Sequence, residues 1–197
     1  RVRPKICKAV ALANNSSDVG LANAAASAIE LLHCASLVHD DLPCFDDATQ
    51  RRGKPSVHAK FGERIAVLTG DALIVAAFQT LATHAIHAVR TERVPLVTAI
   101  VARGVGAPHG ICAGQAWECE RSVDLSRYHR AKTGALFVAA TCAGAAAAGV
   151  AVSPRRASGG ACCPRRQVEV DDTRQGQRSL GARRGKTTTL PRRASRG

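Results

Sequence analysis

The residues from His33 to Pro55 (HCASLVHDDLPCFDDATQRRGKP) carry the strongest chemical signal in this sequence. Their charged side chains come as four carboxylates followed by three cations: Asp40, Asp41, Asp46, Asp47, Arg51, Arg52 and Lys54. Hard cations such as Mg²⁺ bind oxygen ligands and usually keep waters and substrate phosphates in their coordination shell. Arginine and lysine bind phosphate oxygens. The order of charges therefore predicts a metal–diphosphate site, in which the cations face a diphosphate and do not merely neutralise the carboxylates.

The apolar residues before this cluster have a helical periodicity that predicts a long helix over residues 18–39, with Ser16 or Ser17 as its N-cap. His33 and Asp40 are seven residues apart, nearly two turns, and so share one face of that helix. Pro43 must disturb the helix just beyond. That disturbance is needed to bring Asp46 back to Asp40, because a regular helix would point the two side chains in different directions.

The remaining apolar periodicity predicts an all-α protein with close helix contacts at Ala and Gly. Further helices are expected over residues 5–13, 63–89, 94–105, 110–120 and from a cap at Asp124 or Ser126 to 149. No segment has strand-like alternation of useful length. His84 and His87 lie among apolar residues, which favours a packing role over a ligand role.

The aspartate stretch resembles the first aspartate-rich motif of the trans-prenyl diphosphate synthases, in the form Asp40-Asp41, four residues, Asp46, then Arg-Arg-Gly-Lys-Pro. Within that family, the segment HCASLVHDDLPCFDD (residues 33–47) most resembles the geranylgeranyl diphosphate synthases of carotenoid and bacteriochlorophyll pathways. The resemblance covers about residues 1–150 and implies an isoprenoid-synthase-like helical bundle, truncated at its N-terminus. It also implies a Mg²⁺-dependent prenyltransferase that joins an allylic diphosphate, farnesyl or shorter, to isopentenyl diphosphate and yields geranylgeranyl diphosphate.

The same resemblance implies a role for individual residues. Asp40 and Asp46 correspond to direct Mg²⁺ ligands, and Asp41 either binds the metal or supports a ligand. The implied contacts to the allylic diphosphate are Arg51 and Lys132, with Thr133 holding developing charge, and those to isopentenyl diphosphate are Arg3, His33 and Arg52. Gln115 in Gly114-Gln115 corresponds to a position near the substrate tail and the metal. Taken singly these residues have plainer explanations, such as a surface lysine or a hydrogen-bonded core histidine, and only their joint presence in order carries weight.

Product length is predicted from Ala35, five residues before Asp40 and more than one turn down the helix, with Cys34 beside it. Relatives that stop at fifteen carbons carry an aromatic residue there. A methyl group leaves space for another isoprene unit, which favours the twenty-carbon product.

The chain changes character at residue 153. Residues 1–152 have a net charge of +4, and residues 153–197 have a net charge of +9 with little hydrophobic periodicity. We expect a partial prenyl synthase core over 1–152 and a disordered or frame-shifted tail over 153–197. The second aspartate-rich motif of the family has only a poor counterpart, Asp171-Asp172 with Gln175 in the fifth position. An inactive fragment or a non-catalytic partner subunit therefore stays open as the alternative.

Composition bounds the partners and the compartment. Eight scattered Cys without a CxxC pair favour buried thiols in a reducing cytoplasm. The absence of 18 consecutive apolar residues predicts no stable membrane insertion. Nucleic-acid binding through the basic tail is the least favoured function, because no aromatic residue follows Phe137. The start Arg1-Val2-Arg3-Pro4 indicates that the chain begins inside a longer protein, and the resemblance implies a homodimer.

Overall fold

The computed structural model describes residues 1–87 and 91–152. Their elements are helices α1 (Arg3–Ala13), α2 (Val19–Asp40), α3 (Val57–Phe61), α4 (Glu63–His87), α5 (Val94–Val105), α6 (Ile111–Trp117), α7 (Leu125–His129) and α8 (Ala135–Ala147), a π-helical turn η1 (Arg130–Gly134), and a hairpin of β1 (Gln50–Arg51) and β2 (Lys54–Pro55). The all-α prediction is confirmed for this part of the chain. The predicted tail, with Asp171-Asp172, lies outside the described residues.

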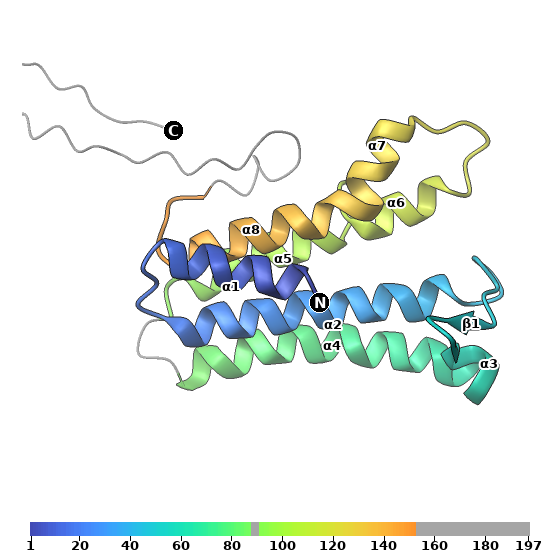
Figure 1. The fold of residues 1–197 in the computed structure, drawn as a ribbon, viewed down its shortest axis with the longest axis horizontal. Coiled ribbons are helices and arrows are strands. Elements are labelled where there is room, and N and C mark those ends of the chain that lie inside the picture. The colour runs from blue at the N-terminus through green and yellow to red at the C-terminus, as the bar shows by residue number, and fades with distance from the viewer. Residues whose placement is uncertain (88–90, 153–197) are drawn as a thin grey trace, which may run out of the picture. The chain divides into compact units, whose positions relative to one another are not determined.

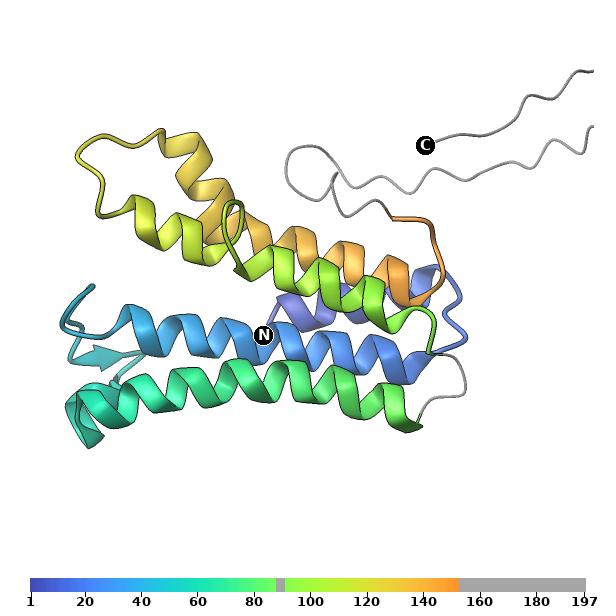
Figure 2. The same ribbon diagram turned by 180° about the vertical axis from the view of Figure 1, so that it is seen from behind.

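Helix α2 is the central element. It packs against α4, α1, α8 and α5, and the long helices run side by side (Figure 1; Figure 2). Its buried face is built largely from alanine, with Leu21, Ile29 and Leu32 as the large side chains. The helix begins at Asp18, whose carboxylate accepts a hydrogen bond from the Leu21 N–H at 2.8 Å. The prediction of Ser16 or Ser17 as the cap was therefore wrong, and the Ser16 hydroxyl instead accepts from the Asp18 N–H.

Small residues let the helices approach closely, as predicted. A Cβ at Gly144 in α8 would lie 2.2 Å from the Cys7 carbonyl oxygen in α1. A Cβ at Gly104 in α5 would lie 2.7 Å from the Ala139 Cβ. Burial in this core raises the pKa of the Cys7 thiol to about 12, so it stays protonated and inert at neutral pH.

The predicted helix from Asp124 to Gly149 forms, but with an irregular turn in it. The Asp124 carboxylate accepts from the N–H groups of Ser126 and Arg127 and caps α7. The π-helical turn η1 then separates α7 from α8 and carries Lys132 and Thr133. Single π turns inside α-helices often mark functional sites.

The chain after α2 turns back through a short hairpin that the sequence pattern did not predict. Arg51 pairs with Lys54, and the two residues between them, Arg52 and Gly53, have φ of 53° and 75°. Positive φ at both central positions is typical of a type I′ turn, which suits Gly at the second. Strands of two residues are too short to give an alternating pattern. The hairpin returns the chain beside the end of α2 (Figure 1), where Arg51 contacts Asp40 and Asp41.

Two of the described helices, α2 and α4, are long and apolar enough by length and composition to cross a membrane. Half of the most apolar window of α2 is buried inside the protein, against 22% for α4. A core helix of a globular protein meets the same criteria, so this is weak support for a membrane span.

Gly144 tests the close contact between α1 and α8. Replacing it by alanine should lower the free energy of unfolding by about 1–3 kcal/mol, because overpacking outweighs the higher helix propensity of alanine. Gly134→Ala is the matched control, since the nearest atom to its Cβ would be 3.7 Å away. Urea unfolding followed by circular dichroism measures both. Equal effects of the two changes would contradict the close-contact explanation.

Candidate functional site

Three carboxylates gather at the end of α2. Asp40 is the last residue of that helix, Asp46 lies in the turn that follows, and Glu118 follows the end of α6. One oxygen of each lies within 4.8 Å of the others. The Asp46 N–H donates to the Asp40 carbonyl oxygen at 3.0 Å, so the chain doubles back after Pro43. The predicted disturbance of the helix therefore does bring Asp46 to Asp40.

Lys132 lies between two of these carboxylates. Its Nζ is 3.2 Å from Asp40 Oδ1 and 2.6 Å from both Glu118 oxygens. Burial lowers the pKa of Lys132, but the hydrogen bonds to Glu118 and Asp40 outweigh it and raise that pKa overall. Burial raises the pKa of Glu118, and hydrogen bonds from Lys132 and Tyr128 more than offset it, so that pKa is lowered. The pair is therefore ionised at neutral pH.

Local backbone geometry places Lys132 there. It sits in the π turn, which widens the helix by one residue and redirects the side chains around it. A Cβ at Gly114 in α6 would lie 2.5 Å from the Lys132 backbone nitrogen. Only glycine allows this approach between α6 and η1. The glycine of the Gly114-Gln115 pair thus has a steric role.

Asp41 points elsewhere. The residue is 3% exposed, and its carboxylate accepts hydrogen bonds from Arg51 Nε at 2.8 and 2.9 Å and from Arg51 Nη2 at 2.5 Å. The expectation that the cations do not fold back onto the acids was wrong for Arg51. A buried carboxylate destabilises the fold unless it has a partner of opposite charge, and the bidentate contact from Arg51 supplies that partner. The hydrogen bonds to Asp41 accordingly raise the pKa of Arg51.

Asp46 is mostly exposed, and its pKa is raised first by partial burial and then by repulsion from Asp40. Ionised carboxylates a few ångströms apart repel one another, and a cation placed among them stabilises their charged forms. Asp40, Asp46 and Glu118 offer oxygen ligands only, the set that suits Mg²⁺. These residues therefore fit a hard divalent cation.

An apolar cavity of about 320 Å³ opens beneath Asp40. Ala35, Leu32 and Ile74 belong to its lining, so the predicted chain-length residue Ala35 does face a cavity. Cys34 is not among the lining residues. Gln115 also lines this cavity, and its buried Nε2 has no hydrogen-bond partner within the part of the chain that the structure describes.

A second group of predicted residues comes from α1, α2 and the turn of the hairpin. The Arg3 guanidinium stacks 4.5 Å from the centre of the Phe137 ring. The pKa of His33 is lowered, first by burial and then by the charge of Arg3, with Arg52 and Arg51 adding to the effect. Arg3, His33 and Arg52 thus share one electrostatic neighbourhood. Thr133 is exposed beside Lys132.

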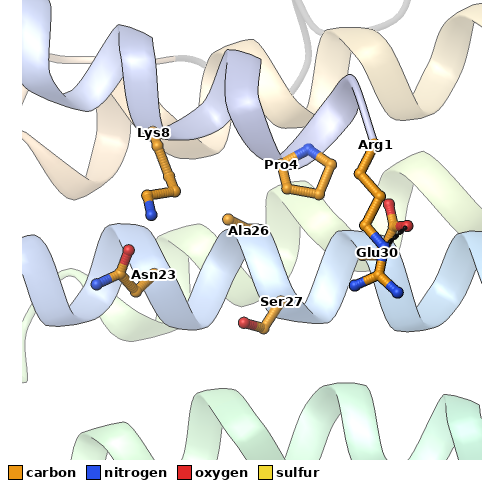
Figure 3. A pocket seen from close by; sticks show the side chains of 7 residues that line it. All are labelled: Arg1, Pro4, Lys8, Asn23, Ala26, Ser27 and Glu30. Atoms are coloured by element: carbon orange, nitrogen blue, oxygen red, sulfur yellow. Dashed lines mark ion pairs between the residues drawn. The ribbon is translucent and has the colours of Figure 1, made fainter.

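A separate hollow of about 380 Å³ lies on the outer side of α1 and α2 (Figure 3). Arg1 and Glu30 form an ion pair of 3.3 Å at one end, and Lys8 and Asn23 lie at the other. The Arg1 side chain is 79% exposed, so this pair adds little stability. None of the three gathered carboxylates borders this hollow.

The sequence pattern did not predict two residues of the site, Glu118 and Tyr128. Glu118 follows Gln115 by three positions, one helical turn, and that spacing from a recognised pair was the available signal. Tyr128, whose hydroxyl donates to Glu118, carries no signal in the sequence. Its partner is ten residues away, just after the end of a different helix.

Comparison with known proteins decides the family. The polyprenyl synthetase family pattern matches residues 1–158. The chain belongs to the polyprenyl synthetase family. It is 57% identical over 155 residues to a geranylgeranyl diphosphate synthase of Cereibacter sphaeroides and 53% identical over 154 residues to that of Rhodobacter capsulatus. Each match covers 78% of this chain and 53% of the relative, so this member of the family spans about half the length of those enzymes.

Solved structures agree with the fold. A crystal structure of an FPP/GFPP synthase from Zymomonas mobilis superimposes with a TM-score of 0.70 at 34% identity. It covers 79% of this chain and 58% of the other. A geranyltransferase from Legionella pneumophila gives a TM-score of 0.68 at 32% identity, covering 80% and 56%. The predicted isoprenoid-synthase-like bundle is confirmed.

The lowered pKa of His33 predicts a pH dependence of stability. The unfolded chain takes up this proton near pH 6.5, whereas the folded chain does so only at lower pH. Protons therefore bind the unfolded state preferentially, and stability present above the unfolded pKa is lost as pH falls below it. His33→Gln should reduce the loss between about pH 7.5 and about pH 5.5. Urea unfolding of both proteins at the two pH values measures this, and identical losses would contradict the assignment.

Proposed function

We propose that this chain is the part of a geranylgeranyl diphosphate synthase that binds the allylic diphosphate and its Mg²⁺. The observation that carries the proposal is Asp40, Asp46, Glu118 and Lys132 meeting at the polar mouth of an apolar cavity. Such a site suits a ligand with a charged, metal-binding head and a long hydrocarbon tail. The geranylgeranyl diphosphate synthases among its relatives support this substrate class.

The reaction is the condensation of farnesyl diphosphate, or a shorter allylic diphosphate, with isopentenyl diphosphate. The allylic carbon–oxygen bond breaks, the diphosphate leaves with the bonding electrons, and the isopentenyl double bond attacks the allylic carbon. Loss of a proton then gives the chain longer by five carbons. Asp40 and Asp46 would hold Mg²⁺, which would neutralise charge on the leaving diphosphate. Glu118, which lies within reach of both aspartates, would be a third ligand.

The protein side chains then have distinct tasks. Lys132 can turn from the carboxylates to the diphosphate once a cation replaces it among them. Arg51 holds Asp41 and, 3.6 Å from Asp40, lines the same edge of the site. Arg3, His33 and Arg52 form the group we assign to isopentenyl diphosphate. The apolar cavity keeps water from the reacting carbon.

Ala35 supports a product of twenty carbons, because a methyl group in the cavity wall leaves the tail room to extend. The buried Cys7 thiol forms no disulfide with the cysteines of the described residues, which supports a reducing compartment, and we propose a cytoplasmic location. Cell fractionation would test that location, and recovery in a membrane pellet would contradict it.

The activity test uses purified protein, farnesyl diphosphate, labelled isopentenyl diphosphate and Mg²⁺. We expect a twenty-carbon product that disappears in Asp40→Asn and falls at least tenfold in Glu118→Gln, since each removes a ligand oxygen's charge. Ala35→Phe should stop elongation at fifteen carbons when shorter allylic diphosphates are supplied. Lys60→Gln, an exposed lysine on α3, is the control.

The alternative function is a non-catalytic partner subunit or an inactive fragment. It follows from the short match to the relatives and the poor second aspartate motif in the sequence. A well-folded sample that binds Mg²⁺ and farnesyl diphosphate but forms no product would establish it.

We also propose that two copies associate through α4. The outward residues of this helix repeat at alternating intervals of three and four and are mostly apolar: Ile65, Leu68, Ala72, Val75, Gln79, Ala82 and Ile86. Leu68 is 62% exposed and Val75 64% exposed. A stripe at this spacing is the pattern by which two helices pack together.

Light scattering after size-exclusion chromatography tests the association. The unmodified chain should have twice its own mass, and Leu68→Glu should shift it to the monomer by placing a charge in the interface. Leu12→Glu is the matched control, because Leu12 is 76% exposed on α1, outside the stripe. A monomeric unmodified chain, or an equal effect of both changes, would contradict the interface.

A further inference from the structure

Helices α2 and α4 are joined near both ends by a histidine that lies on a glycine of the facing helix. Near the carboxylates, His39 of α2 lies on Gly70 of α4, where a Cβ would be 1.9 Å from the imidazole Nε2. Its Nε2 is 3.3 Å from the Val67 carbonyl oxygen and 3.7 Å from Asp71 Oδ1. We call this the proximal contact. A carbonyl oxygen can only accept, so Nε2 carries a proton.

A second contact, which we call the distal contact, also places a histidine ring on a glycine, but here the histidine is on α4 and the glycine is on α2. His84 of α4 lies on Gly20 of α2, where a Cβ would be 2.8 Å from the ring Cε1. Its Nε2 is 3.3 Å from the Asp18 carboxylate. Gly20 is twenty residues from Asp40 along α2, about 30 Å. The distal contact therefore joins the same two helices far from the gathered carboxylates.

The proximal contact holds the turn that presents the carboxylates. Asp40 follows His39 directly, and the His39 carbonyl oxygen accepts from the N–H groups of Asp41 and Leu42. Successive residues of a helix differ by about 100° around its axis. While the His39 ring is fixed on α4, Asp40 is turned away from α4 toward Lys132. His39 also lines the apolar cavity beside Ala35.

We infer that His39, seated on Gly70, is a positioning residue that holds Asp40 in the orientation needed to bind the metal–diphosphate, whereas His84 only joins the helices. This inference rests on the proposed function, because it concerns the same metal and diphosphate. His39 does not itself touch either group. Its contribution acts through the rotation and rigidity of the last turn of α2.

Manganese and inorganic pyrophosphate serve as probes on the full chain, with bound Mn²⁺ followed by the loss of the free-ion electron paramagnetic resonance signal. His39→Ala should weaken Mn²⁺ binding in the presence of pyrophosphate by about 10–100-fold, the usual effect of removing a group that orients a ligand. His84→Ala should change it less than twofold. Both variants should lose similar stability in urea, since each loses one interhelical contact.

Two further variants separate positioning from general damage. His39→Gln keeps a donor within reach of the Val67 carbonyl oxygen and should restore most of the affinity. Gly70→Ala should weaken binding by displacing the ring, and should add little in the His39→Ala background, because there is no ring left to displace.

The outcomes distinguish the two proposals. If the unmodified chain binds Mn²⁺ with pyrophosphate but His39→Ala binds equally well, or His84→Ala is as harmful, the positioning role is wrong and the proposed function stands. If the unmodified chain does not bind the probes, the proposed function fails and the positioning role fails with it.

Discussion

The carboxylates at the end of α2 impose the main electrostatic constraint on this fold. A helix that packs against four others ends in two adjacent acidic side chains, and burying their charges is costly without partners of opposite charge. Asp41 is held by Arg51 from the hairpin, and Asp40 by Lys132 from the π turn. The hairpin and the irregular turn between α7 and α8 are the two departures from regular helix packing that bring those cations in. Both serve the same carboxylate cluster.

The close packing of the bundle makes this cluster possible. Glycine at positions 70, 104, 114 and 144 lets facing helices approach to distances that a Cβ would prevent. At Gly114 that approach sets the position of Lys132, and at Gly70 it makes room for His39. The same small residues that build the core therefore also set the orientation of the charged groups at its end.

A divalent cation bound among these carboxylates would compete with Lys132 for the same oxygen atoms. The lysine neutralises Asp40 and Glu118 in the free protein, and a cation among Asp40, Asp46 and Glu118 would release it. Burial and repulsion from Asp40 raise the pKa of Asp46, which means that its ionised form is destabilised. A cation among the carboxylates would stabilise that ionised form. Under the proposed function, a bound cation would free Lys132 for the diphosphate, and the binding of the two ligands would then be interdependent.

The sequence by itself determined the family, most of the helices and the acidic cluster after α2, because these depend on local spacing and a contiguous motif. Asp40 and Asp46 belong to that motif, whereas Lys132 was expected from the family resemblance, and the structure brings its Nζ to Asp40. Only the tertiary structure revealed that Glu118 and Tyr128 belong to the site. It also revealed the pairing of Arg51 with Asp41 and the contact of the His39 ring with Gly70. Each of these contacts joins different parts of the chain, and the hairpin turn or the packing of helices decides which atoms meet. Local periodicity contains no information about that distance.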